Sequence, residues 1–335
     1  ICVHGAKPHL RARWDEPVNA GEQFVFVPAP GGVAEIIWFI VILIVSVTVS
    51  LLLTPGQGST PDTNIGETPQ PDPVFTLRGQ QNEKKLSTPV EASYGRFRTW
   101  PSYGASPYST FIGNNAYLFQ LFCLGHGKFD VHQIYIEDTE LDEFTDIEYQ
   151  IVEPGDAVTL FPDNVFTSTE VGGIELFGPN ETSFTDWTSG YVACPPLQQT
   201  TRIEVDVSLP RGMYFATGAV LSTRQSVCEF QYRKIDDAGA ILGPWTTGVI
   251  FDKTLKTPTP QRYTLEITVP LGRYEVRAVR TNNAELNHAG TSQTKWLGLR
   301  AYLPSVLVYP GVTMLALKAK ATNNLNDSAS TRVNV

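Results

Sequence analysis

The sequence predicts a mainly β protein: a β-barrel or sandwich domain that carries an inserted β-sandwich domain and is preceded by one hydrophobic helix and a proline-rich linker. Apolar and polar residues alternate along Ile203–Leu209 and again along Tyr263–Val269, which is the period of a half-buried strand. Turn-forming residues are frequent, with 27 Gly and 24 Pro among 335 residues. Short strands without amphipathic helices between them are typical of sandwiches and barrels.

The chain before residue 74 divides into three parts. Residues 1–32 are expected to be the end of a small β-rich region, with a short strand around Phe24–Val27. Residues 33–53 form a hydrophobic segment, and residues 54–73 hold five Pro and three Gly without a basic residue. Such a composition cannot bury a core, so residues 54–73 are predicted to be an extended, semi-rigid tether.

The hydrophobic segment contains a run without any charged residue, Gly or Pro, from Ile36 to Leu53. As a helix this run would span ~27 Å, close to the ~30 Å hydrocarbon core of a bilayer. The run predicts transient contact with a membrane. Two alternatives remain: a helix packed among copies of itself, or a pair of strands, because the run is rich in Ile and Val. Its bulky residues are Ile36, Ile37, Trp38, Phe39, Ile40, Ile42, Leu43, Ile44, Leu51, Leu52 and Leu53.

The remainder is expected to be two β domains, one inserted into the other. Residues 74–189 are the first part of the outer domain, residues 190–303 are the inserted sandwich, and residues 304–335 return to the outer domain. Turns are predicted at Asp236–Gly239 and at Pro270–Gly272. Because the chain opens at Ile1 rather than Met and its last strand is followed closely by its end, we expect it to be a piece of a longer protein.

The sequence offers no recognisable catalytic or metal-binding pattern. GxSxG, P-loop, HExxH and strand-linked GxGxxG motifs are absent, the five His follow no triad, and the four Cys have no CxxC spacing. The acidic run Glu137–Glu148 is interpreted as a solvated turn, with Leu141, Phe144 and Ile147 facing the core. We therefore expect no enzymatic activity, no bound metal and no cofactor. A formal charge of −9 disfavours binding to nucleic-acid phosphates, and Cys194 and Cys228 could be bridged or free.

Several stretches, in order along residues 74–335, resemble one known family. They are FTLRGQQN at 75–82, YGR at 94–96, LFCLGHG at 121–127, PRG at 210–212, GRYEVR at 272–277, GLRAYL at 298–303 and ATNN at 321–324. The ordered set is similar to the hub region of the tail tip attachment protein J family, the host specificity proteins of lambda-like siphophages. The motif positions are Gly79, Asn82, Tyr94, Gly95, Gly125, Gly127, Arg211, Gly212, Gly272, Arg273, Tyr274, Arg300, Tyr302, Asn323 and Asn324.

The resemblance implies a hub-type β domain in a homotrimer, which closes the tail tube at the tip of the virion and supports the central fibre for host attachment and DNA ejection. It implies contacts with the distal tail protein, other tail-tip proteins and the tape measure protein, and with the host envelope through a C-terminal part that this chain does not contain. It implies no catalytic residues. Two other classes stay open: a single-pass bacterial surface protein with β binding domains, and a carbohydrate-binding tail module that uses Trp187, Trp245 and Trp296.

Overall fold

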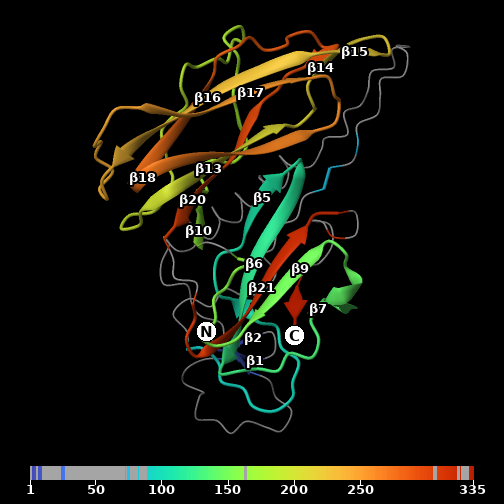
Figure 1. The fold of residues 1–335 in the computed structure, drawn as a ribbon, viewed down its shortest axis with the longest axis vertical. Coiled ribbons are helices and arrows are strands. Elements are labelled where there is room, and N and C mark those ends of the chain that lie inside the picture. The colour runs from blue at the N-terminus through green and yellow to red at the C-terminus, as the bar shows by residue number, and fades with distance from the viewer. Residues whose placement is uncertain are drawn as a thin grey trace. The chain divides into compact units, whose positions relative to one another are not determined.

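The structure is a computed structural model, and it describes residues 2–4, 7–9, 24–26, 72, 74–75, 82, 89–161, 164–304, 308–322, 325 and 332–335. The described part is mainly β, which confirms the predicted fold class (Figure 1). The chain divides into two compact units, residues 1–58 and residues 59–335, which are described separately.

The first unit is described by three short strands, β1 (Cys2–His4), β2 (Lys7–His9) and β3 (Phe24–Phe26). They form an antiparallel sheet in the order β2-β1-β3, and β3 falls on a predicted strand. The run 36–53 lies outside the described residues, so its helical form stays a prediction. Among the residues that the structure describes, none belongs to a helix with the length and apolar character needed to cross a bilayer.

In the second unit, one sheet joins segments from its two ends. Strand β21 (Val312–Lys320) pairs with β6 (Asn115–His126) on one side and with β9 (Ile147–Val152) on the other. The sheet has the order β4-β6-β21-β9, with β5 added to β6, and a smaller sheet has the order β22-β7-β8. We call these strands the β6–β21 domain. Its remaining elements are β4 (Ser102–Tyr103), β5 (Tyr108–Ile112), β7 (Tyr135–Ile136), β8 (Thr139–Glu140), a 3₁₀ turn (Leu141–Glu143) and β22 (Val333–Asn334).

Alternate side chains of β21 enter two hydrophobic clusters. Leu315 belongs to the cluster between the two sheets, and Leu141, Phe144 and Ile147 contact that cluster, as the spacing within the acidic run predicts. Met314 belongs to a second cluster on the opposite face. Because successive side chains of a strand point to opposite faces, the apolar sequence of β21 supplies both clusters at once.

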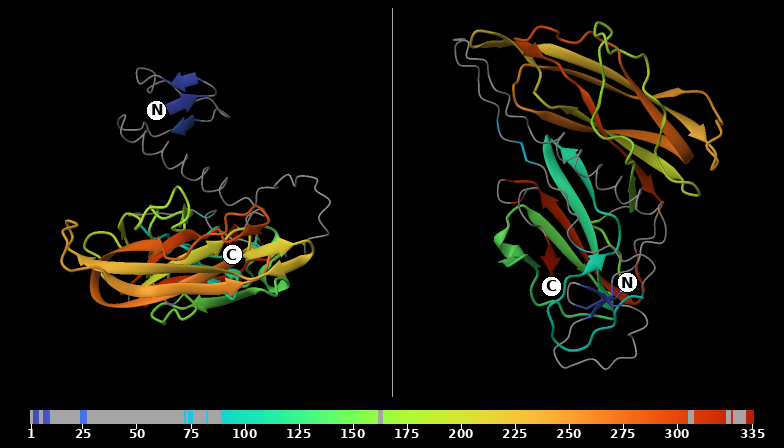
Figure 2. Two further views of the ribbon diagram at one scale, coloured as in Figure 1. Left: turned by 90° about the horizontal axis from the view of Figure 1, so that it is seen from above. Right: turned by 180° about the vertical axis from the view of Figure 1, so that it is seen from behind.

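The strands from β10 to β20 form a second β domain, which we call the sandwich domain (Figures 1 and 2). Its main path has the order β10-β20-β13-β18-β16-β17, β11 and β12 are added to β20 and β18, and a small sheet has the order β15-β14-β19. The core contains the fully buried side chains of Trp296, Phe230 and Val205. The strands are β10 (Asn164–Thr167), β11 (Ile174–Glu175), β12 (Tyr191–Val192), β13 (Thr200–Leu209), β14 (Tyr214–Thr217), β15 (Val220–Ser222), β16 (Arg224–Ile235), β17 (Thr246–Leu255), β18 (Gln261–Arg280), β19 (Gly290–Thr291) and β20 (Lys295–Leu303).

Strand β18 is longer than the sequence predicts. Residues 261–268 pair with β13 and residues 273–280 pair with β16, so one strand of 20 residues serves both halves of the sandwich. The predicted turn at Pro270–Gly272 is therefore wrong, because these residues lie within the strand where it passes from one half to the other. An added Cβ at Gly272 would lie 2.8 Å from Cε of Lys234, the flexible end of a side chain that can move away. The predicted turn at Asp236–Gly239 is confirmed, with Gly239 N donating to Asp236 O at 3.1 Å.

Strand β13 is buried on both faces, whereas its alternation predicts a half-buried strand. Ile203 and Val205 face the sandwich core as expected, but Glu204 and Asp206 on the other face are buried as well. Their hydrogen-bond partners belong to the sandwich domain itself, and two of these partners, Thr264 and Tyr302, in turn contact β5 of the β6–β21 domain. The pattern of one strand contains no information about a second domain that covers its polar face.

Candidate functional site

Charged and hydroxyl side chains collect on the polar face of three adjacent strands of the sandwich domain. Glu204 of β13 lies opposite Arg300 of β20, and Asp206 lies opposite Thr264 of β18. Directly opposite side chains on neighbouring strands are about 4.5–5.5 Å apart at Cβ, which is close enough for one continuous network. We call these four residues, with Arg202 and Tyr302, the ionic network.

Arg300 is the centre of the ionic network. Its guanidinium donates to both carboxylate oxygens of Asp206, with 2.8 Å between Nη2 and Oδ1, and Nη2 also donates to Oε2 of Glu204 at 3.0 Å. The three side chains are only 4–6% exposed. A bidentate pair of this kind fixes the orientation of its carboxylate as well as its charge.

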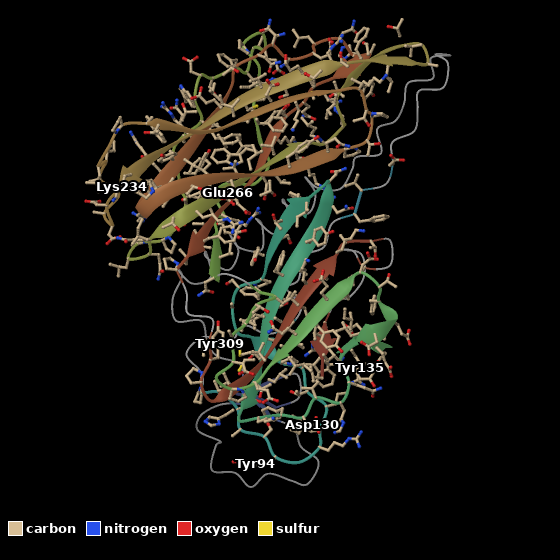
Figure 3. The ribbon with its side chains drawn as sticks, viewed as in Figure 1. Tyr94, Asp130, Tyr135, Lys234, Glu266 and Tyr309 are labelled. Carbon is tan, nitrogen blue, oxygen red and sulfur yellow. The ribbon has the colours of Figure 1, made fainter. Side chains whose placement is uncertain are left out.

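Tyr302 and Arg202 complete the partners of Glu204. The Tyr302 hydroxyl donates to Oε2 at 2.8 Å, and Nη2 of Arg202 donates to Oε1 at 2.7 Å. The Arg202 guanidinium also stacks on the Tyr302 ring, with 3.9 Å between Cζ and the ring centroid. Its Nε lies 2.9 Å from Oε2 of Glu266, an exposed residue at the edge of the network (Figure 3).

Burial and neighbouring charges have opposite effects on the pKa of Arg300. Burial lowers the pKa of the guanidinium, but the charges and hydrogen bonds of Asp206 and Glu204 outweigh it, so the pKa of Arg300 lies above its ordinary value. The pKa of the Tyr302 hydroxyl is also raised, first by burial and then by the negative charge of Glu204. Arg300 therefore stays charged and Tyr302 stays protonated near neutral pH.

Strand β5 of the β6–β21 domain contacts the ionic network through Thr264. The Thr264 hydroxyl donates to Oδ1 of Asp206 at 2.6 Å. The Thr264 hydroxyl oxygen itself accepts hydrogen bonds from the backbone N of Phe111 at 3.0 Å and from the Thr110 hydroxyl at 3.2 Å. One hydroxyl therefore links the buried carboxylate to the backbone of the other domain.

The hairpin turn between β5 and β6 makes a second polar connection. Gly113 and Asn114 have φ values of 56° and 69°, the left-handed pair of a two-residue type I′ turn. Oδ1 of Asn114 accepts from the backbone N of Arg262 at 2.9 Å, and Nδ2 donates to the carbonyl of Pro260 at 2.9 Å. Nη2 of Arg262 donates to the Asn114 carbonyl at 2.9 Å. The turn is thus bound to the first residues of β18.

A hydrophobic cluster lies beside these polar contacts and contains side chains from both domains. Tyr108 and Phe161 pack with Val165 of β10 and with Tyr302. The Tyr108 and Tyr302 rings meet edge to face, with centroids 6.1 Å apart and planes at 78°. Polar and apolar contacts together join the two β domains along this face.

The motif positions of the family resemblance are spread over the second unit and do not gather at one point. Arg300 and Tyr302 belong to the ionic network. Nδ2 of Asn82 donates to the carbonyls of Pro101 and Val333, at 2.9 and 2.8 Å, and its Oδ1 accepts from the backbone N of Val333 at 3.0 Å. Asn82 therefore connects β22 to the segment before β4 through hydrogen bonds.

Other motif positions shape the backbone. Arg273 donates to the carbonyls of Cys194 and Asp236, at 3.0 and 2.7 Å, and the Tyr274 hydroxyl donates to the carbonyl of Pro270 at 2.6 Å. The motif glycines with positive φ are Gly95, Gly125, Gly127 and Gly212, and Gly272 lies where β18 changes sheets. Tyr94 and Arg211 are exposed. Gly79, Asn323 and Asn324 lie outside the described residues.

The tryptophans considered for carbohydrate binding have other contacts. Trp296 is fully buried, and its Nε1 donates to the carbonyl of Gly298 at 2.9 Å. The rings of Trp187 and Trp245 both lie over the Arg277 guanidinium, with Cζ 4.1 and 4.2 Å from their centroids. Trp296 therefore cannot be part of a sugar platform, and arginine side chains lie over each of the other two rings.

Cys123, Cys194 and Cys228 are free cysteines, which decides between the two alternatives for Cys194 and Cys228. Burial raises the pKa of the Cys228 thiol to about 11, although a hydrogen bond with Ser226 opposes the shift. Burial also raises the pKa of the Cys194 thiol. Both side chains behave as small apolar core residues.

The charged residues of the ionic network are visible in the sequence, but the pattern of a single strand does not reveal that they pair. Glu204 and Asp206 alternate with apolar residues, and Arg300 does the same in a strand 94 or more residues later. Each strand by itself predicts a solvent-facing side chain. Only their pairing, together with a covering domain, turns these charges into a buried network. Thr264 and Asn114 carry no signal of their own.

The arrangement can hold two β domains in a fixed relation. The carboxylates of Glu204 and Asp206 are bound by guanidinium and hydroxyl donors, and Arg300 and Tyr302 each keep one protonation state. Across the described ranges, no group of three or more His, Cys, Asp or Glu side chains is placed to hold a metal ion.

Comparison with known proteins assigns no family, because no family model and no curated protein matches the chain. Among solved structures, the stem and receptor-binding domain of spike protein P1 from bacteriophage PM2 is similar over 48% of this chain and 68% of that chain, with 12% identity and a TM-score of 0.25. Its receptor-binding domain alone is similar over 42% of this chain and 95% of that chain, with 13% identity and a TM-score of 0.24. A chain of infectious bursal disease virus, Gx strain, is similar over 64% of this chain and 49% of that chain, with 12% identity and a TM-score of 0.20. These neighbours come from viruses, but TM-scores this low do not establish a common fold.

Proposed function

We propose that the chain is a structural protein of a bacteriophage tail tip. In this proposal it forms a homotrimeric hub that closes the tail tube and supports the central fibre for host attachment and DNA ejection. The observation that carries the proposal is the ordered set of motifs between Phe75 and Asn324, which resembles the hub region of the protein J family. No catalytic role is proposed for any residue.

The geometry of the second unit supports this role. A hub must keep its β domains in a fixed relation while other proteins assemble on it, and such assemblies rely on large complementary surfaces. The ionic network, the Asn114 turn and the shared hydrophobic cluster provide a fixed relation between the two β domains. The described motif positions Asn82, Arg273 and Arg300 make structural contacts.

The proposal includes a set of partners. The distal tail protein, other tail-tip proteins and the tape measure protein contact the hub, and a part of the protein beyond this chain contacts the host envelope. The run 36–53 either plugs the tube in the resting particle or contacts a membrane during ejection. Deletion of 36–53 separates these roles, because DNA transfer into receptor-bearing liposomes is lost only if membrane contact is required.

Immunogold labelling of purified phage particles tests the location. An antibody against the sandwich domain is expected to label the distal end of the tail, and an antibody against a tail-tube protein serves as the positional control. Label on the envelope of uninfected bacteria, with none on particles, would overturn the proposal. That outcome would favour the single-pass surface protein instead.

A further inference from the structure

One end of the sandwich domain exposes four aliphatic side chains. Leu197, Ile241, Leu242 and Leu271 are 84%, 58%, 58% and 52% exposed. They come from three separate segments: the loop before β13, the connection between β16 and β17, and the bend of β18. We call these four residues the apolar tip.

Hydrogen bonds hold the three segments together at this end. The backbone N of Leu197 donates to Oδ1 of Asp237 at 2.8 Å, and that of Leu242 donates to the carbonyl of Lys234 at 2.9 Å. Nζ of Lys234 donates to the carbonyl of Leu271 at 3.4 Å. Lys234 marks this end of the domain in Figure 3. The apolar tip is therefore one local feature and not four scattered side chains.

The backbone of Leu197 adds an independent observation. Its φ is 63°, in the left-handed region that residues with a Cβ rarely adopt. Strained residues of this kind persist where the surrounding structure imposes them, and they cluster at active sites, ligand clamps and switch regions. Here the strained residue is also the most exposed member of the apolar tip, although a leucine side chain is stabilised by leaving water.

We propose that the apolar tip inserts into a lipid surface. Its members are all aliphatic, whereas contacts between proteins concentrate their binding energy in Trp, Tyr and Arg and rarely in Leu. Three of them lie in loops and the fourth, Leu271, lies in strand β18, all at one end of the domain. The same chain also contains the run 36–53, whose length and apolar composition predict contact with a bilayer.

The charges around the apolar tip indicate which lipid it prefers. Lys234 is exposed, but Asp236 and Asp237 lie beside it, and both carboxylates accept hydrogen bonds from loop backbone N–H groups. The tip therefore has no excess of positive charge to attract anionic headgroups. We expect insertion to depend on apolar contact, to proceed with zwitterionic lipid and to change little with salt.

A fluorescent probe on the full chain tests the inference. A nitrobenzoxadiazole group on Leu242→Cys, with Cys2 and Cys123 replaced by Ser, is expected to shift to shorter wavelength and brighten when phosphatidylcholine vesicles are added. The matched control is the same probe on Val220→Cys, an exposed position in the β14–β15 hairpin. Because residues 36–53 are themselves predicted to contact a bilayer, the comparison between the two probe positions is the readout.

A shift at position 242 without one at position 220 supports the inference. Equal shifts at both positions, a shift at neither, or no association with vesicles would overturn it. Adding Leu197→Asp to the 242-labelled chain should raise the lipid concentration needed for the shift about tenfold or more. Leu286→Asp, at an exposed leucine outside the tip, should leave that concentration unchanged. Circular dichroism of each variant confirms that it is folded.

Discussion

Arg300 neutralises two carboxylates that have almost no access to water. Replacing it with methionine would leave Asp206 buried without its cation and Glu204 with Arg202 alone, and the loss of one partner of a buried pair costs about 3–5 kcal/mol. We expect Arg300→Met to lower the free energy of unfolding by that amount, as measured by urea denaturation.

An exposed ion pair provides the control for this prediction. Nζ of Lys318 lies 2.8 Å from Oε1 of Glu148, and Glu148 is exposed. Glu148→Gln should change the free energy of unfolding by less than about 1 kcal/mol, because water replaces the lost partner. Equal effects of Arg300→Met and Glu148→Gln would contradict the burial of the ionic network.

The raised pKa of Cys228 predicts slow thiol chemistry. With a pKa of about 11, only about 0.1% of the thiol is ionised at pH 8, and the thiolate fraction rises only as the pH approaches 11. We expect Cys228 to remain unmodified by a disulfide reagent at pH 8 in the native chain and to react at once in guanidinium chloride. Mass spectrometry of the peptides checks this, and equal native and denatured rates would refute it.

Among single residues, the resemblance identified Arg300 and Tyr302 as important positions, but not their partners. Glu204 and Asp206 look like ordinary solvent-facing residues of a half-buried strand. Their role depends on strand pairing and on the covering domain, and both are properties of the folded chain rather than of the local sequence.

The turn between β5 and β6 is an element that reaches from one β domain to the other. Asn114→Gly keeps the left-handed backbone available but removes the two side-chain hydrogen bonds to Arg262 and Pro260. We expect a loss of about 1–3 kcal/mol in a denaturation experiment. Asn115→Ala, at the exposed neighbour, should have a much smaller effect. If the two variants are equally stable, the turn does not contribute to the joint between the domains.

A comparison of two glycines distinguishes the cost of backbone strain from the cost of steric overlap. Gly212 and Gly218 have φ values of 68° and 60°, so alanine at either position costs about 1–2 kcal/mol. At Gly212 an added Cβ would also overlap the Thr257 carbonyl and Pro258, whereas at Gly218 nothing lies within 4 Å. Gly212→Ala should therefore lower the melting temperature clearly more than Gly218→Ala, and the reverse order would contradict the packing at Gly212.

At the level of elements, alternation predicted where strands form but not how far they run. The strand predicted at 263–269 is correct, yet the Pro–Leu–Gly that follows it lies within the same strand. A short Gly- and Pro-containing segment fits either a turn or a bend, and only pairing with both β13 and β16 decides between them. The turn at 236–239 was predictable because Asp and Gly there supply the turn directly.

For the whole molecule, composition and spacing were sufficient to predict a mainly β chain. The joint between the two β domains was not predictable, since it combines residues from β5, β13, β18 and β20 that are far apart in sequence. We propose that the two joined β domains assemble with copies of themselves around the tail tube.

The mass of the purified full chain in detergent tests whether it assembles as a trimer. Size-exclusion chromatography with light scattering, corrected for bound detergent, is predicted to give one species with three times the 36.9 kDa chain mass. A species with the mass of a single chain at every concentration would contradict the hub.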